Sequence, residues 1–264
     1  MTASGGRPSP LAQMPSALAV DGVSKRFGGL IAVSDVTLAV PLGERRVLIG
    51  PNGAGKTTLF NLIAGDLAVS QGRIELFGAD VTALPVAARV RRGLRRTYQT
   101  SALFDELSVG EHLYLGLLGP EGVGHFDMLR AVRRQPELWR RIEAAAVRVG
   151  LERRLATRAR TLSHGERRQL EIGLALCGEP RLVLLDEPAA GLSPEERGVL
   201  TVLLRSFERT VTVLMIEHDM DVALGFADYI TVLQEGAVVA EGAPEAVVAN
   251  PIVQEAYLGR RHSA

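Results

Sequence analysis

The sequence predicts an α/β fold with a mostly parallel sheet core, an antiparallel β layer and a helical subdomain. Three observations lead to this fold class. In the second half of the chain, short apolar runs alternate with helical patterns. Strand-like runs of alternating or apolar residues lie near the start of the chain, and residues 108–149 have the apolar spacing of helices. Helices that alternate with short buried strands indicate a parallel sheet with helices on both faces.

Composition and charge limit the number of domains and the classes of partner that this chain can have. The 264 residues suffice for one α/β domain or two small ones. Thirty basic residues balance thirty acidic residues, so a nucleic acid is not expected as a partner. No apolar run approaches the ~20 residues of a membrane-spanning helix. We therefore expect a chain that is soluble or reaches a membrane through another chain.

The single cysteine, Cys177, lies in an apolar helical pattern. One cysteine cannot build a disulfide framework, which favours a reducing compartment. We interpret Cys177 as a buried, inert thiol, with a catalytic thiol as the alternative.

The pattern suggests one continuous domain between two short tails. Residues 1–16 are rich in Ser, Gly, Pro and Ala and lack the apolar core of a secretory signal, so we expect a flexible N-terminal tail. The predicted domain spans residues 17–259, with its helical subdomain at about 100–165 and a C-terminal tail at 260–264. We find no internal repeat.

The β layer is predicted first along the chain. Alternating or apolar runs predict strands at residues 17–23 and 36–40. Together with residues 45–49 they suggest a partly antiparallel layer. Residues 72–78, with a glycine at each end, predict a further short strand.

A helical stretch follows this layer. Residues 85–92 predict a short helix. Ser108 is a predicted N-cap, and Glu111 three residues later completes a capping box for a helix to about residue 118. A loop at 119–124 and a helix at 126–149 complete the helical insert.

The second half of the chain alternates between strands and helices. Predicted helices cover residues 166–177, 194–208, 244–249 and 251–259. Predicted strands cover residues 182–185, 211–216, 229–233 and 237–241. The last two strands flank Glu235 and Gly236, a turn that suits a hairpin.

A glycine-rich loop follows the apolar run 47–49 and leads into the helical run 59–64. It reads Gly50, Pro51, Asn52, Gly53, Ala54, Gly55, Lys56, Thr57 and Thr58. The spacing matches G-x-x-x-x-G-K-S/T, in which backbone N–H groups wrap phosphates, the lysine reaches the terminal phosphates and the threonine hydroxyl binds Mg²⁺. Lys25 and Lys56 are the only lysines of the chain. The alternative is a glycine-rich turn that binds nothing.

Charged side chains end two of the predicted parallel strands. Asp186 and Glu187 follow the strand at 182–185, and His218 follows the strand at 211–216. Ligands of parallel sheets lie beyond the carboxyl ends of the strands, so Asp186 would hold Mg²⁺ and Glu187 would polarise an attacking water. His218 would contact the γ-phosphate or hold Glu187. A structural acidic turn and a structural histidine are the alternatives.

Two further motifs have both a structural and a functional interpretation. Ser163 and Glu166 form a capping box that needs no ligand, although a helix N-terminus with Ser163 and Gly165 also suits an anion. Phe27 lies about twenty residues before the phosphate loop, where its ring either stacks on an adenine or packs in the core.

An arginine cluster coincides with the helix at 85–92. It consists of Arg89, Arg91, Arg92, Arg95 and Arg96. Such a run is usually a solvated face, and the alternative is contact with phosphates or an acidic partner.

The motifs taken together resemble the nucleotide-binding subunit of ATP-binding cassette (ABC) transporters, a family of P-loop NTPases, across nearly the whole chain. The resemblance rests on residues 50–58, Gln99, residues 162–166, residues 182–187 and His218. It implies an ATPase that uses ATP and Mg²⁺. It also implies a head-to-tail dimer in which each ATP lies between the phosphate loop of one chain and residues 162–166 of the other.

The resemblance also implies roles for single residues. Glu187 would be the general base. Ser163 and Gly165 would donate to the γ-phosphate across the interface, with Glu166 in the same segment. Gln99 would sense Mg²⁺ and the attacking water. The sequence departs from the family pattern at His164, Glu166, Phe27 and Ser193, where a glycine, a glutamine, a tyrosine and an aspartate are usual.

The implied partners are membrane proteins. The dimer would contain either two copies of this chain or this chain and a sister ATPase. It would lie on the cytoplasmic face of the bacterial plasma membrane. The helical insert and the segment after Gln99 would dock the coupling helix of a transmembrane permease, and a solute-binding protein would act indirectly. ATP binding would close the dimer and hydrolysis would reopen it.

Within this family, residues 186–194 and 250–259 look similar to the branched-chain (hydrophobic) amino-acid uptake group. Urea and amide importers share these features, and lipopolysaccharide-export ATPases come close. A non-transport cassette ATPase usually carries a coiled-coil insertion or two cassettes, which this sequence lacks. A phosphate-loop GTPase would carry a guanine-reading Asn-Lys-x-Asp, also absent, and a kinase would not need residues 162–166.

Overall fold

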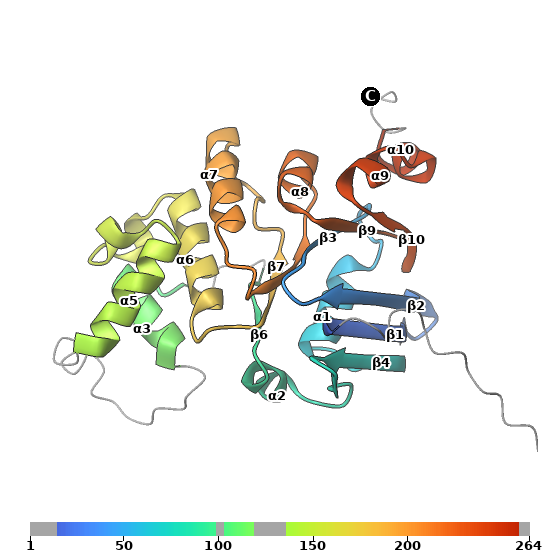
Figure 1. The fold of residues 1–264 in the computed structure, drawn as a ribbon, viewed down its shortest axis with the longest axis horizontal. Helices are drawn as coiled ribbons and strands as arrows, with labels where there is room; N and C mark the ends of the chain where they lie inside the picture. Colours follow the sequence, from blue (N-terminus) through green and yellow to red (C-terminus); the bar gives the residue numbers. More distant parts are fainter. Residues whose placement is uncertain (1–14, 99–102, 119–135, 259–264) are drawn as a thin grey trace, which may run out of the picture.

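The computed structural model describes residues 15–98, 103–118 and 136–258. The predicted α/β class is confirmed. Within the described residues, a four-stranded sheet and a six-stranded sheet lie side by side, and three helices gather at the opposite end of the molecule (Figure 1). None of the described helices is both long and apolar enough to cross a bilayer.

The four-stranded sheet is antiparallel, with the order β2-β1-β4-β5. Its strands are β1 (Ser16–Phe27), β2 (Leu30–Pro41), β4 (Gln71–Leu76) and β5 (Ala79–Asp80). The strands predicted at 17–23 and 36–40 are confirmed as parts of one long hairpin. Buried side chains such as Leu18, Val20 and Leu38 fill its inner face.

The six-stranded sheet has the order β10-β9-β3-β8-β7-β6 and is parallel except for β10. Its strands are β3 (Arg45–Ile49), β6 (Leu94–Arg96), β7 (Leu182–Asp186), β8 (Thr212–Ile216), β9 (Tyr229–Gln234) and β10 (Ala237–Gly242). The expectation that residues 45–49 join the antiparallel layer is wrong. Val47, Leu48 and Ile49 are fully buried, because a central parallel strand is covered on both faces.

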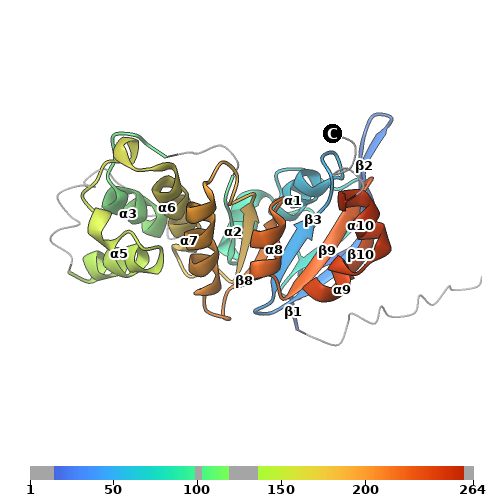
Figure 2. The same ribbon diagram turned by 90° about the horizontal axis from the view of Figure 1, so that it is seen from above.

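Helices cover both faces of the six-stranded sheet. Figure 2 shows α7 (Pro194–Arg205) and α8 (Met220–Phe226) on one face and α1 (Lys56–Ala64) on the other. Val47 packs with the α7 and α8 side chains, whereas Leu48 packs with α1 and the antiparallel sheet. The alternation of side chains along β3 therefore serves two apolar cores.

The described helical group packs against the first of these cores. It consists of α3 (Val109–Leu118), α5 (Pro136–Arg148) and α6 (His164–Leu176), with short 3-10 turns at Glu152–Arg154 and Ala159–Thr161. The predicted capping box that starts α3 is present, because Ser108 N–H donates to Glu111 and Glu111 N–H donates to Ser108 Oγ. The loop predicted at 119–124 and the start of the helix predicted at 126–149 lie outside the described residues.

The remaining helices are α2 (Val86–Arg91), α9 (Pro244–Val248) and α10 (Pro251–Leu258), near the predicted positions. The helix α8 and the strand β6 have no counterpart among the predictions. The predicted hairpin turn is confirmed, since Glu235 and Gly236 both have positive φ, 49° and 82°.

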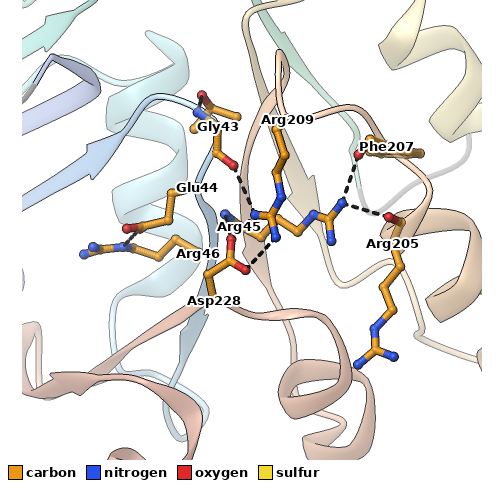
Figure 3. Close-up of polar contacts among 9 residues, drawn as sticks. Gly43, Glu44, Arg45, Arg46, Arg205, Phe207, Arg209 and Asp228 are labelled. Atoms are coloured by element: carbon orange, nitrogen blue, oxygen red, sulfur yellow. Dashed lines mark hydrogen bonds and ion pairs between the residues drawn. The ribbon is translucent and has the colours of Figure 1, made fainter.

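A polar cluster fixes the amino-terminal edge of the six-stranded sheet (Figure 3). The Arg45 guanidinium donates to the carbonyls of Arg205, the last residue of α7, and of Phe207, at 2.8 and 2.9 Å. Asp228 accepts from Arg45 N–H and pairs with the Arg209 guanidinium. Burial favours a higher pKa for Asp228, but these donors outweigh it and hold the pKa below its usual value. The cluster holds the end of α7 against β3, the strand whose carboxyl end leads into the glycine-rich loop.

Candidate functional site

The glycine-rich loop joins β3 to α1 at the carboxyl edge of the sheet. Gly53 and Gly55 have φ of +82° and +96°, which only glycine adopts readily. A Cβ on Gly55 would lie 2.4 Å from Ala32 O on β2. No side chain caps α1 at Gly55, so the first N–H groups of the helix are available to an anion.

Lys56 projects into this loop. Only 5% of the residue is exposed, and Nζ donates to Gly50 O at 2.8 Å and Pro51 O at 3.0 Å. Burial lowers the pKa of Lys56, whereas Glu187 and Asp186 oppose this shift. The ammonium is therefore held inside the loop by carbonyl groups that a phosphate can replace.

Asp186 ends β7 beside the loop and is 1% exposed. Arg96 Nη2 donates to Asp186 Oδ2 at 3.0 Å, and Asp186 N–H donates to Thr97 Oγ1 at 3.1 Å. Arg168 of α6 donates to Asp186 O at 2.7 Å. Burial raises the pKa of the Asp186 carboxyl, and the hydrogen bond and charge of Arg96 oppose the rise.

This carboxylate has the features of a magnesium ligand. Oδ1 of Asp186 is buried and has no hydrogen-bond partner among the described residues. Within the same part of the chain, no three His, Cys, Asp or Glu side chains cluster as a metal cage. Mg²⁺ is normally held by one or two carboxylates together with phosphate oxygens and waters. The orphan Oδ1 and the hydroxyl of Thr57, on the first turn of α1, therefore fit this ion.

Glu187 and His218 meet at the same edge. His218 Nε2 lies 2.7 Å from Glu187 Oε1, although the residues follow different strands. Glu187 has φ of +47°, an uncommon conformation for a non-glycine residue, and its N–H donates to Ile216 O at 3.0 Å. A carboxylate in this position, held by an imidazole, can accept a proton from water.

Glu217 supports this arrangement, although its place at the strand end beside His218 led to no predicted role. It is 2% exposed and accepts from the N–H groups of His218, Asp219 and Ala189 at 2.8, 3.1 and 3.2 Å. Burial raises its pKa, and these N–H donors oppose the rise. Its position directly before His218 was the available signal.

The second candidate motif lies at the start of α6. The capping box is present, with Ser163 N–H donating to Glu166 Oε2 at 2.9 Å and Glu166 N–H donating to Ser163 Oγ at 3.1 Å. Gly165 N–H donates to Glu196 Oε1 at 3.0 Å. Glu196 also accepts from Ser193 N–H at 2.9 Å, which ties the start of α6 to the start of α7. No pattern in the sequence predicted this contact.

The two motifs do not form one site within the chain. A cavity of about 230 Å³ beside Ser163 is lined by residues of α6 and α7 and of the turns before them, and no phosphate-loop residue lines it. Lys56, Asp186, Glu187 and His218 come together, whereas Ser163 and Gly165 lie apart from them.

Two predicted residues remain to be placed. Phe27 is 46% exposed at the end of β1, so its interpretation as a core aromatic is wrong. Its ring lies 5.1 Å from Lys25 Nζ, on the hairpin whose Ala32 contacts Gly55. Gln99 lies outside the described residues. Next to it in the sequence, Tyr98 is 50% exposed and its ring lies 4.9 Å from the Arg96 guanidinium.

The sequence matches two known protein families. The family described as "ABC transporter" matches residues 33–190, and the family described as "Branched-chain amino acid ATP-binding cassette transporter" matches residues 237–263. The high-affinity branched-chain amino acid transport ATP-binding protein BraF of Pseudomonas aeruginosa is 39% identical, with 92% of this chain and 97% of BraF covered. The protein LivG of Escherichia coli K12, which has the same description, is 40% identical, with 92% and 97% covered.

Solved structures share the fold. An ATP-binding cassette of an ABC transporter in its ADP conformation has a TM-score of 0.80 at 30% identity, with 92% of this chain and 99% of the solved chain covered. A nucleotide-free ATP-binding cassette from an ABC transporter has a TM-score of 0.79 at the same identity.

Proposed function

Because this chain belongs to the ABC transporter family, we propose that it is the ATP-hydrolysing subunit of an importer. The importer takes up branched-chain or other hydrophobic amino acids through partner permeases. The observation that carries the ATPase assignment is the meeting of Lys56, Asp186, Glu187 and His218 at one sheet edge. The relatives BraF and LivG and the match at residues 237–263 support the substrate class.

The chain's own groups bind and orient the nucleotide. The loop N–H groups and Lys56 bind the β- and γ-phosphates, exchanging the carbonyl partners of Nζ for phosphate oxygens. Phe27 stacks on the adenine from the β1–β2 hairpin. Thr57, Asp186 and Gln99 would hold Mg²⁺, which would neutralise phosphate charge when bound.

Glu187 is the general base in this proposal. Its carboxylate accepts the proton of the attacking water, and the 2.7 Å contact with His218 fixes the direction of the carboxylate. A positioned base of this kind contributes about 10²- to 10⁴-fold to a rate. Glu217 fixes the backbone of His218 in turn.

Hydrolysis requires two chains. Ser163 and Gly165, with Glu166 in the same segment, complete the nucleotide site of a neighbouring copy or of a sister ATPase, because they lie apart from Lys56 within one chain. The γ-phosphate links the two half-sites and thereby closes the dimer. The permease docks against the helical insert and the segment that follows Gln99, on the cytoplasmic face of the plasma membrane, and a solute-binding protein delivers the solute to the permease.

The test uses the chain together with its membrane partners. The chain is purified with candidate permease subunits, placed in nanodiscs, and assayed for ATP hydrolysis with a solute-binding protein loaded with leucine, isoleucine or valine. Stimulation by these amino acids and not by urea is expected. Stimulation by urea or a short amide alone would assign a different substrate. Absence of ATPase activity in every assembly would refute the assignment of this chain as an ATPase.

A further inference from the structure

The arginine cluster of residues 89–96 does not form one solvated face. Arg89 is 1% exposed and donates to the carbonyls of Leu62 and Ile63 at the end of α1, at 2.6 and 2.8 Å. Arg96 turns toward Asp186. The interpretation as a solvated face is therefore wrong for these two side chains, which bind groups within the chain.

The other three arginines line a groove. Arg91, Arg92 and Arg95 lie with Arg181 around a groove of about 630 Å³, bounded by α2, the β4–β5 turn and the loop before β7. We call this feature the arginine groove. Glu179 is its one acidic lining residue, and it forms no ion pair with these arginines in the described part of the chain.

Neutral partners hold three of the four guanidinium groups in place. Arg95 Nη1 donates to Val90 O at 2.8 Å and Leu94 O at 2.9 Å, and Arg92 Nη1 donates to Ala88 O at 3.2 Å. The Arg181 guanidinium lies 3.6 Å from the centroid of Phe77. The groove thus gathers like charges in restrained positions, which is unfavourable alone and becomes favourable when an anionic partner binds.

The position of the groove indicates the partner. Arg95 also lines a second cavity, of about 180 Å³, together with Tyr98, Leu103 and Leu174. Tyr98 and Leu103 flank the segment at which the proposed function docks a permease. One arginine therefore belongs both to the arginine groove and to the proposed docking surface.

We propose that the arginine groove binds an acidic segment of the permease, beside the segment that docks at Tyr98 and Leu103. Carboxylates pair with guanidinium groups through two parallel hydrogen bonds, which gives direction as well as attraction. The restrained arginines lose little side-chain freedom on pairing, which favours binding. This inference rests on the proposed function, since it needs a permease as partner.

The low lysine content of the chain permits a direct test. Lys25 and Lys56 are its only lysines. Arg91→Lys introduces an amine into the arginine groove, and a zero-length carbodiimide then couples this amine to any carboxylate that it contacts. The complex with its permeases is treated in nanodiscs, and the products are mapped by mass spectrometry. Arg205→Lys, at an exposed residue of α7 that lies outside both the helical insert and the arginine groove, is the matched control.

We expect a new amide bond between the introduced lysine and Asp or Glu of the permease in the Arg91→Lys complex and not in the control. Coupling only within this chain, or equal coupling in the control, overturns the proposal. The unsubstituted complex identifies bonds formed by Lys25 and Lys56.

An association assay separates the possible occupants. Arg91→Glu with Arg92→Glu should weaken binding to the permease at least 10-fold at low salt and reduce its salt dependence, while ATP binding by the isolated chain stays unchanged. Arg91→Lys with Arg92→Lys should restore association. Equal affinity of the charge-reversed and unsubstituted chains overturns the proposal.

Vesicles test the alternative occupant. If the isolated chain binds phosphatidylglycerol vesicles and the charge-reversed variant does not, the groove serves anionic lipid and the proposal is overturned. A chain that hydrolyses ATP but never associates with the permease overturns both this inference and the transport assignment. Loss of the groove contact alone leaves solute-stimulated ATPase activity measurable, so the two failures are distinguishable.

Discussion

The guanidinium of Arg96 donates to Oδ2 of Asp186 at 3.0 Å, and both side chains are nearly inaccessible to solvent, at 7% and 2% exposure. Arg96 also donates to Asn61 and Asp66 near the end of α1, at 2.6 and 2.8 Å. The exposed ring of Tyr98 lies over the same guanidinium. Arg96 thus joins an exposed aromatic to the carboxylate that fits Mg²⁺, and orients that carboxylate from the side opposite to its free oxygen.

Arg96→Ala should lower the free energy of unfolding by about 3–5 kcal/mol, because it leaves Asp186 buried without its cation. Burial already raises the pKa of Asp186, and loss of Arg96 raises it further. A neutral carboxyl needs no partner, so the deficit should be smallest near the ordinary Asp pKa of about 3.9 and grow as the pH rises through the raised value. Urea unfolding of both proteins between pH 4 and 8 measures this difference.

The same position should affect the metal more than the nucleotide. In Arg96→Lys, which keeps the positive charge, ADP should bind normally without Mg²⁺ but gain less affinity on Mg²⁺ addition. Calorimetric titration with and without Mg²⁺ gives both affinities. An unchanged Mg²⁺ effect would mean that Arg96 stabilises the fold only.

Lys56→Ala should abolish measurable ATP binding, because the loop loses the buried ammonium that binds the terminal phosphates in the proposed site. A fluorescent nucleotide titration checks this. Lys25→Ala, which removes the other lysine and its 5.1 Å contact with Phe27, should change affinity far less. Unchanged affinity in Lys56→Ala would refute the phosphate-loop assignment.

Glu187→Gln should bind ATP but turn over at least about 100-fold more slowly, because the amide cannot accept the proton of water. ATP should then accumulate in a closed dimer, detectable by size-exclusion chromatography with light scattering. Turnover at the normal rate would contradict the role of Glu187. A monomer at high concentration, even with the sister and membrane subunits present, would contradict the shared site.

Ser163→Ala should leave ATP binding to the phosphate loop unchanged and reduce hydrolysis, since Ser163 serves the neighbouring chain in the proposed dimer. The variant also loses an N-cap, which costs about 1 kcal/mol. Thr161→Ala, two residues away and also exposed, controls for changes in the same loop. If Ser163→Ala hydrolyses ATP normally despite the lost cap, Ser163 serves only α6.

Cys177 should make the protein less stable at alkaline pH. Burial raises the pKa of its thiol to about 12, whereas an unfolded cysteine ionises near pH 8.5. Above that pH the unfolded chain loses a proton that the folded chain retains, so the free energy of unfolding falls by up to about 1.4 kcal/mol per pH unit. Cys177→Ala should show a shallower decline between pH 8.5 and 10.5. Equal slopes in urea unfolding would contradict this.

Local patterns were sufficient for much of the fold and for the residues that meet at the carboxyl edge of the six-stranded sheet. The glycines of the phosphate loop, the capping box at Ser163 and the turn at Glu235 each depend on chain neighbours, so the sequence displays them directly. The strand ending at Asp186 was visible because all five of its residues are buried.

Features set by distant partners were not visible. The strand β6 has three residues, two of them arginine, and its extended state comes from pairing with β7. Helix α8 has only seven residues, and its cap is Asp219, which accepts from Val222 N–H at 3.0 Å. The contacts of Glu196 with Gly165 and of Arg96 with Asp186 join residues 31 and 90 positions apart.

The contact between Glu196 and Gly165 places a carboxylate on the N–H group that the proposed dimer offers to the γ-phosphate. In the proposed dimer, an arriving phosphate competes with this carboxylate for the same N–H group, and two negative groups approach each other until the exchange is complete. In that dimer, closing exchanges one anion for another at the start of α6.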